Sequence, residues 1–150
     1  MVCLEDISLS PLAAGLLNFA AVAKELAEHL EIDSAGLNGN HIGQQPLDEI
    51  LATAINHGFQ LTHEARQLDS DDLEYFDEVL VMDSSMLDEV LAKTKNSIQK
   101  EKVRLITEYD PRKKKPSNVL EPKNLQLDEL EELYEHLWYC CMGFLGRVSS

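Results

Sequence analysis

Short apolar segments alternate with amphipathic helical segments along this chain of 150 residues. The clearest apolar segment is 78–82, a run of β-branched and aliphatic residues that predicts a buried strand. Residues 2–3, 32–35 and 103–106 are shorter candidates of the same kind. Four strands separated by helices predict an α/β fold, in which a parallel sheet carries helices on both faces as a three-layer structure.

Apolar residues recur at helical spacing in the segments between these strands. The longest such segment runs from Pro11 to about Leu30, and Pro11 suits the first turn of a helix. Further helices are predicted over residues 46–57, 68–76, about 83–95 and 127–145. The charged, proline-bearing segment 109–127 is predicted to be an irregular loop. A chain of this length fits one domain, so we expect residues 1–150 to form a single domain.

Composition excludes several classes of function. The chain carries 27 acidic against 13 basic residues, a formal net charge of −14. We therefore expect no nucleic-acid partner, because such binding needs a basic face. We also expect no membrane span and no signal peptide, since no long apolar stretch and no basic leader are present. Three cysteines, two of them adjacent, form no disulfide framework and favour a cytoplasmic location.

The first eleven residues, M-V-C-L-E-D-I-S-L-S-P, have the layout of strand, loop and helix N-terminus. Cys3 lies at the end of the first predicted strand, where ligands bind in open parallel sheets. Backbone N–H groups and the helix dipole at such a place stabilise a thiolate or a bound oxyanion. The loop nevertheless carries Glu5 and Asp6 and no cation. The alternative is that Cys3 is a small buried residue at a strand end.

Several short motifs, taken together, resemble one family. The first loop aligns with the family sequence V-C-x-G-N-x-C-R-S-P, and seven further landmarks follow in the same order. They are D-S-A-G at 33–36, H-I-G at 41–43, H-G at 57–58, T-H-E-A-R-Q at 62–67, F-D-E-V-L-V-M-D at 76–83, Y-D-P at 109–111 and C-C-x-x-F-L at 140–145. Over nearly its whole length the chain is similar to the low-molecular-weight protein tyrosine phosphatases, whose fold is shared by related arsenate reductases. The resemblance implies a four-stranded parallel sheet in the order 2-1-3-4, flanked by helices.

The resemblance also implies a mechanism. Cys3 would be the nucleophile that forms a phosphocysteine, and Ser10 would support its thiolate. Glu121, in a Glu-Pro pair, would occupy the position of the family's aspartate general acid. The phosphate would be held by the backbone N–H groups of Leu4, Glu5, Asp6, Ile7, Ser8, Leu9 and Ser10.

The chain departs from the family at important positions. Leu9 stands where the family has its phosphate-binding arginine, and one lost oxyanion donor typically costs about 10²–10³ in rate. Glu5 and Asp6 replace a glycine and an asparagine, and either carboxylate would repel phosphate if it pointed inward. Ser8 replaces a second loop cysteine. The family's flanking aromatic residues are replaced by Asn40, Lys123 and Asn124.

Two functions therefore remain open. The first is a pseudophosphatase, which keeps the fold and acts through a protein partner. The second is a weakly active cysteine-dependent phosphatase acting on a phosphorylated protein or a small phosphomonoester. A third, arsenate reduction, lacks evident shuttle cysteines.

Other reactive side chains are given structural roles. We expect no cofactor and no metal site, because the cysteines and histidines show no ligand spacing. His41, His57 and His63 are assigned to loops and helix ends, and Arg66 to ion pairs with nearby carboxylates. The basic run 112–115 is predicted to be a solvated turn or, alternatively, a source of positive potential at the mouth of the site.

Overall fold

A four-stranded parallel sheet forms the centre of the molecule. A computed structural model describes all 150 residues, and its strands are β1 (Val2–Cys3), β2 (Ala35–Gly36), β3 (Val79–Val81) and β4 (Val103–Leu105). They are ordered β2-β1-β3-β4, with Val2 opposite both Ala35 and Val81. The predicted fold class and the 2-1-3-4 order are therefore confirmed.

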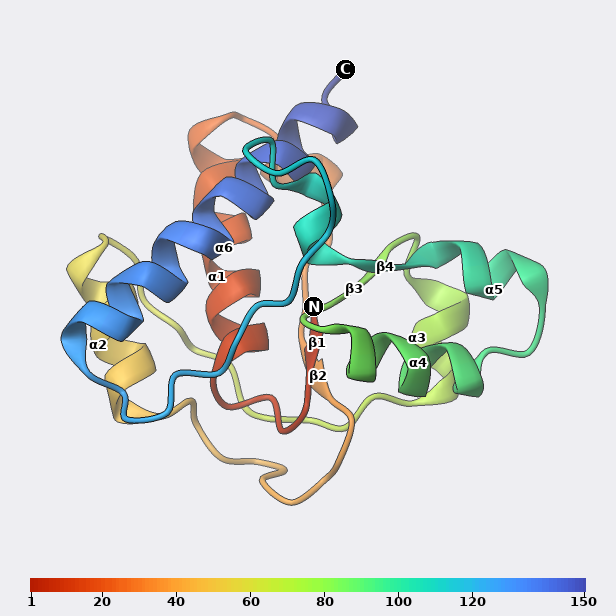
Figure 1. Cartoon of the computed structure of the whole chain (residues 1–150), viewed down its shortest axis with the longest axis horizontal. Helices are drawn as coiled ribbons and strands as arrows, with labels where there is room; N and C mark the ends of the chain where they lie inside the picture. The colour runs from red at the N-terminus through yellow and green to blue at the C-terminus, as the bar shows by residue number, and fades with distance from the viewer.

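The helices cover the sheet in two groups (Figure 1). On one side lie α1 (Leu9–Ala23), α2 (Asp48–Asn56) and the long α6 (Leu127–Val148), which pack against each other. On the other side lie α3 (Ser70–Tyr75), α4 (Ser84–Lys93) and α5 (Ser97–Lys102). Two short 3₁₀ turns, η1 (Ala27–His29) and η2 (Ile106–Tyr109), complete the chain. No helix combines the length and the apolar character that a membrane crossing needs.

The core is divided by the sheet into two parts, as the period of a strand requires. Leu80 joins the larger cluster of 22 buried residues, which α1 and α6 dominate. Val79 and Val81 point the other way, into a cluster of 7 buried residues that includes Val90 of α4. Cys3 belongs to the larger cluster, so the predicted nucleophile lies on the α1 side of the sheet.

Three elements differ most from the sequence predictions. The first helix ends at Ala23 rather than near Leu30, because Glu25 adopts a left-handed conformation with φ of 59°. The second strand occupies Ala35–Gly36 instead of 32–35, since its register is set by pairing with β1. Helix α5 was not predicted; Asn96 caps it by accepting a hydrogen bond from the backbone of Gln99 at 2.8 Å.

Candidate active site

The loop between β1 and α1 is shaped as a cradle of backbone N–H groups. Those of residues 5–8 donate to no oxygen acceptor in the protein, and the next two belong to the open first turn of α1. The carbonyls of Leu4 and Ile7 instead accept hydrogen bonds from outside the loop, from Asn38 and Leu47 at 3.0 and 2.9 Å. Because these carbonyls are hydrogen-bonded to residues outside the loop, the free N–H groups form a site suited to an anion.

Asp6 makes the turn of this loop. Its φ is 60°, a left-handed conformation that aspartate tolerates better than most residues. Its side chain is fully buried and points inside the loop, where Asp6 Oδ1 accepts a hydrogen bond from Ser10 Oγ at 2.9 Å. Ser10 Oγ in turn lies 2.8 Å from Cys3 Sγ. Cys3, Ser10 and Asp6 therefore form one continuous chain of polar atoms.

The direction of this chain follows from the charge of Asp6. Burial raises the pKa of the Asp6 carboxyl, but the combined effect of hydrogen bonds from His63, Ser34 and the Arg66 backbone is larger and leaves the pKa below its ordinary value. An ionised carboxylate only accepts hydrogen bonds. The single Ser10 proton consequently goes to Asp6, and Ser10 Oγ faces Cys3 as an acceptor.

Cys3 is thereby favoured as a thiol. Burial raises the pKa of Cys3 above its ordinary value, although Ser10 and the backbone N–H groups of Glu5 and Asp6 oppose that effect. A hydroxyl that donates to Asp6 cannot also donate to a thiolate. The protonated form of Cys3, which can donate to Ser10 Oγ, fits this arrangement better than the charged form.

Polar groups behind the loop fix Asp6 in place. His63 Nε2 lies 2.5 Å from Asp6 Oδ2 and 3.0 Å from Ser34 Oγ, and the backbone N–H of Arg66 donates to Asp6 Oδ2 at 3.1 Å. From the sequence, His63 was predicted to have only a structural role, and Ser34 was not singled out. Ser34 and His63 belong to the family-like motifs at 33–36 and 62–67. These motifs were the signal in the sequence from which a role at the site could have been predicted.

Arg66 faces away from the loop. Its guanidinium donates to Asp33 at 3.0 Å and binds Asp72 through two parallel hydrogen bonds of 3.0 and 3.1 Å. The predicted ion pairs of Arg66 with nearby carboxylates are confirmed. Arg66 helps to form the polar cluster behind Asp6. Its positive charge is paired with Asp33 and Asp72 and is not directed into the loop.

The remaining loop side chains bring no positive charge to the cradle. Leu9 is 1% exposed and packs in the apolar core, whereas Leu4 is half exposed. Ile7 and Ser8 are buried. The Glu5 carboxylate lies 3.3 Å from His41 Nε2 at the edge of the loop.

Glu121 approaches the same loop from the other side. Burial of its carboxyl group raises the pKa of Glu121, the Glu5 carboxylate raises it further, and the Ser8 hydroxyl opposes the change. Glu121 thus lies at the edge of the loop that follows Cys3, near Ser8 and Glu5, although the residue as a whole is exposed. The positions of the missing aromatic residues, Asn40, Lys123 and Asn124, are all exposed.

Comparison with known proteins agrees with this geometry. A family model described as low molecular weight phosphotyrosine protein phosphatase matches residues 1–150. The chain belongs to this family. It is 31% identical to the human low molecular weight phosphotyrosine protein phosphatase over 149 residues, which cover 98% of this chain and 92% of the human protein.

Solved structures share the fold. A protein tyrosine phosphatase from Entamoeba histolytica superimposes with a TM-score of 0.91 at 24% identity, covering 99% of this chain and 94% of that one. A structure described as drosophila arginine phosphatase gives a TM-score of 0.88 at 26% identity, covering 99% and 96%. The fold of this phosphatase family is therefore found with more than one described substrate.

In the basic run 112–115, the charge of Arg112 does not reach the Cys3 loop. The Arg112 guanidinium donates to Asp110 at 3.1 and 3.0 Å and lies 3.8 Å from the ring centre of Tyr139 on α6. Figure 1 places this turn near the C-terminal half of α6, at the opposite end of the molecule from the loop after β1. Of the two sequence interpretations, the solvated turn fits this position.

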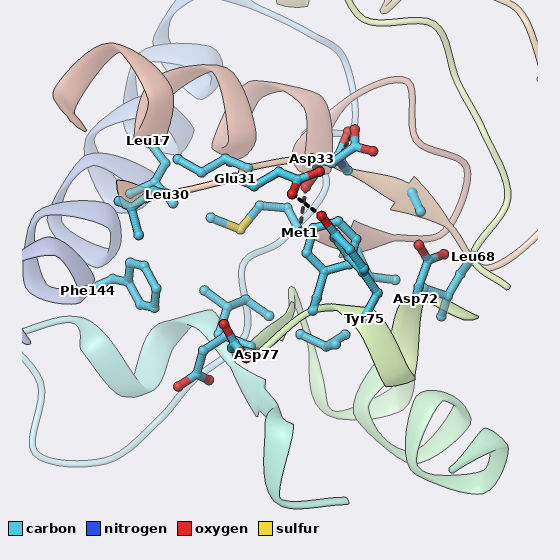
Figure 2. Close-up of a pocket in the computed structure, with 18 of the residues that line it drawn as sticks. Met1, Leu17, Leu30, Glu31, Asp33, Leu68, Asp72, Tyr75, Asp77 and Phe144 are labelled. Carbon is cyan, nitrogen blue, oxygen red and sulfur yellow. Dashed lines mark hydrogen bonds between the residues drawn. The ribbon is translucent and has the colours of Figure 1, made fainter. Parts of the chain in front are cut away.

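A pocket of about 460 Å³ also lies away from the loop. It opens at the amino ends of the strands, whereas Cys3 lies at a carboxyl end. Figure 2 shows Met1 between Asp33 and Tyr75, with the Tyr75 hydroxyl bonded to Glu31. This pocket therefore does not contain Cys3 or the residues of the loop that follows it.

Proposed function

We propose that this protein is a catalytically impaired member of the phosphatase family, which acts by binding rather than by hydrolysis. The observation that carries the proposal is the hydrogen bond from Ser10 to the Asp6 carboxylate. Because that bond uses the Ser10 proton, the group that would stabilise a Cys3 thiolate is no longer a donor. The chemistry of a phosphocysteine intermediate needs a thiolate as nucleophile.

The residue at position 9 supports the same conclusion. A leucine cannot supply the paired, charged hydrogen bonds with which an arginine holds a phosphate dianion. The backbone N–H cradle is intact, but on its own it provides only neutral donors. The ionised Asp6 inside the loop and Glu5 at its edge add negative charge to the site. Further negative charge would develop there on a bound phosphate in the transition state.

The proposal also covers the domain organisation, the partner and the location of the protein. Residues 1–150 act as one phosphatase-like domain with a protein partner. We place the protein in the cytoplasm, because Cys3, Cys140 and Cys141 are all free thiols.

A second function is kept because of Glu121. Its carboxyl group meets the loop with a raised pKa, as a general acid for a leaving oxygen requires, and Cys3 lies below the same cradle. A slow phosphatase would use Cys3 as nucleophile and Glu121 as acid. Its substrate would be a protein phosphotyrosine or another phosphomonoester.

Hydrolysis of para-nitrophenyl phosphate separates the two functions. We expect the wild-type protein to react no more than about threefold faster than Cys3→Ser. Such a result means that no thiolate-dependent turnover remains. A wild-type rate at least tenfold above Cys3→Ser, and lowered by Glu121→Gln, would establish the slow phosphatase instead.

A further inference from the structure

Three potential metal ligands meet at the opposite end of the molecule from the Cys3 loop. Asp110 follows η2, and His136 and Cys140 lie one turn apart on α6, so their side chains share a face of that helix. One ligand atom from each residue lies within 4.8 Å of the others. A carboxylate, an imidazole and a thiol thus converge on one small volume.

The cluster is buried and contains an unpaired nitrogen. Asp110 and Cys140 are 3% and 0% exposed, and the His136 side chain is 17% exposed. His136 Nε2 is buried without a hydrogen-bond partner, and its distance of 3.6 Å to Asp110 Oδ2 is too long for one. A buried polar nitrogen left unpaired is costly. A cation between this nitrogen, the carboxylate and the sulfur would satisfy it.

Close packing fixes the spacing of the three residues. A Cβ atom at Gly143 would lie only 1.7 Å from the carbonyl oxygen of Tyr109. Glycine therefore lets α6 approach the backbone next to Asp110, almost one turn after Cys140. The ligands come from two segments that are held together without any metal.

Nearby charges permit a divalent cation. Arg112 occupies part of the Asp110 carboxylate and also lies 3.6 Å from Glu135. Each carboxylate oxygen has two acceptor positions, so Asp110 Oδ2 keeps one for a metal. Without an ion, Arg112 and Lys113 bring two positive charges against three negative ones from Asp110, Glu135 and a Cys140 thiolate, so a divalent ion changes the local charge only from −1 to +1.

We propose that Asp110, His136 and Cys140 bind Zn²⁺, with a water molecule as the fourth ligand. Zinc accepts sulfur, nitrogen and oxygen ligands in tetrahedral geometry, and the Cys140 proton would be released to solvent on binding. Through Asp110, the ion would connect the start of the segment that leads to Glu121 with helix α6. No metal site was predicted from the sequence, because the spacing of His136 and Cys140 was not recognised and the proximity of Asp110 depends on the fold.

Titration of the chelator-treated full chain with Co²⁺, followed by Zn²⁺, tests this site. We expect one Co²⁺ per chain, a sulfur-to-cobalt charge-transfer band, and displacement by Zn²⁺. His136→Gln should weaken Co²⁺ binding about tenfold or more, because it removes a ligand and not only a supporting contact. Cys140→Ser should remove the charge-transfer band.

Cys3→Ser and His57→Gln are matched controls, since each removes the same type of residue outside the cluster. Both should keep the affinity and the band. Zn²⁺ should raise the Tm of the wild-type protein more than that of His136→Gln, and a cooperative melting transition of the variant without metal verifies that it folds. Binding below one equivalent, equal affinity in wild type and His136→Gln, or a band lost only in Cys3→Ser would overturn the proposal.

Discussion

The Cys3 loop and the Arg66 cluster lie on the two sides of Asp6, and they treat charge in opposite ways. In the loop, the Asp6 carboxylate meets a serine and a thiol, with no cation among the loop side chains. Behind it, Arg66 binds two carboxylates, Asp33 and Asp72, at close range. The positive charge of this region is therefore behind the loop and not inside it.

This difference separates the scaffold of the site from its chemistry. The Arg66 cluster holds the loop in shape, and the backbone cradle keeps an anion-binding form. What differs from the family pattern is the set of loop side chains: Leu9 packs in the apolar core and brings no charge, and Asp6 accepts the hydrogen bond of Ser10. A fold can thus preserve the geometry of a reaction site after its electrostatics have been altered.

The largest expected effect comes from replacing Leu9 and Asp6 together with the arginine and asparagine of the family sequence. We expect Leu9→Arg with Asp6→Asn to raise kcat/KM for para-nitrophenyl phosphate about 100-fold over wild type, since one oxyanion donor alone is worth about 10²–10³. Each single change should give less than about tenfold, because a cation without a thiolate, or a thiolate without a cation, does not complete the site. Steady-state kinetics measure all three.

The double variant with Cys3→Ser added is the control and should be inactive. If the double variant stays within threefold of wild type, the proposal that Leu9 and Asp6 impair catalysis is wrong.

The sequence was informative about the loop because its residues are contiguous. Cys3, Leu9 and Ser10 could be placed from the order of strand, loop and helix, and the sheet order followed from the family resemblance. The inward direction of Asp6 could not be predicted, because it depends on His63 and Ser34, which come from distant segments. The end of α1 and the start of β2 were missed for a similar reason, since tertiary contacts override local periodicity.

The second prediction concerns the wall behind the loop. Breaking a buried ion pair costs about 3–5 kcal/mol. The Arg66 side chain is 31% exposed, so Arg66→Leu should lower the free energy of unfolding by about 2 kcal/mol. Arg104→Leu is the matched control, because its contacts with Glu78 and Glu108 are longer, at 3.8 and 3.7 Å, and more exposed. That variant should lose less than about 1 kcal/mol in urea unfolding. Equal losses in the two variants would mean that the Arg66 cluster is not a special support.

The smallest effect should appear in the dependence of stability on pH. The pKa of Asp6 is lowered in the folded protein, so its contribution to stability is present above the ordinary aspartate pKa, about 3.9, and is lost as pH falls through the folded value. Asp6→Asn cannot lose that contribution, although it is less stable near neutral pH. The stability difference between wild type and Asp6→Asn should therefore shrink below about pH 4, as measured by urea unfolding at each pH. A difference that stays constant from neutral pH down to pH 2 would mean that folding does not shift the pKa of Asp6, and a difference that grows as pH falls would mean that Asp6 is protonated in the native loop. Either result would remove the cause of the reversed hydrogen bond of Ser10.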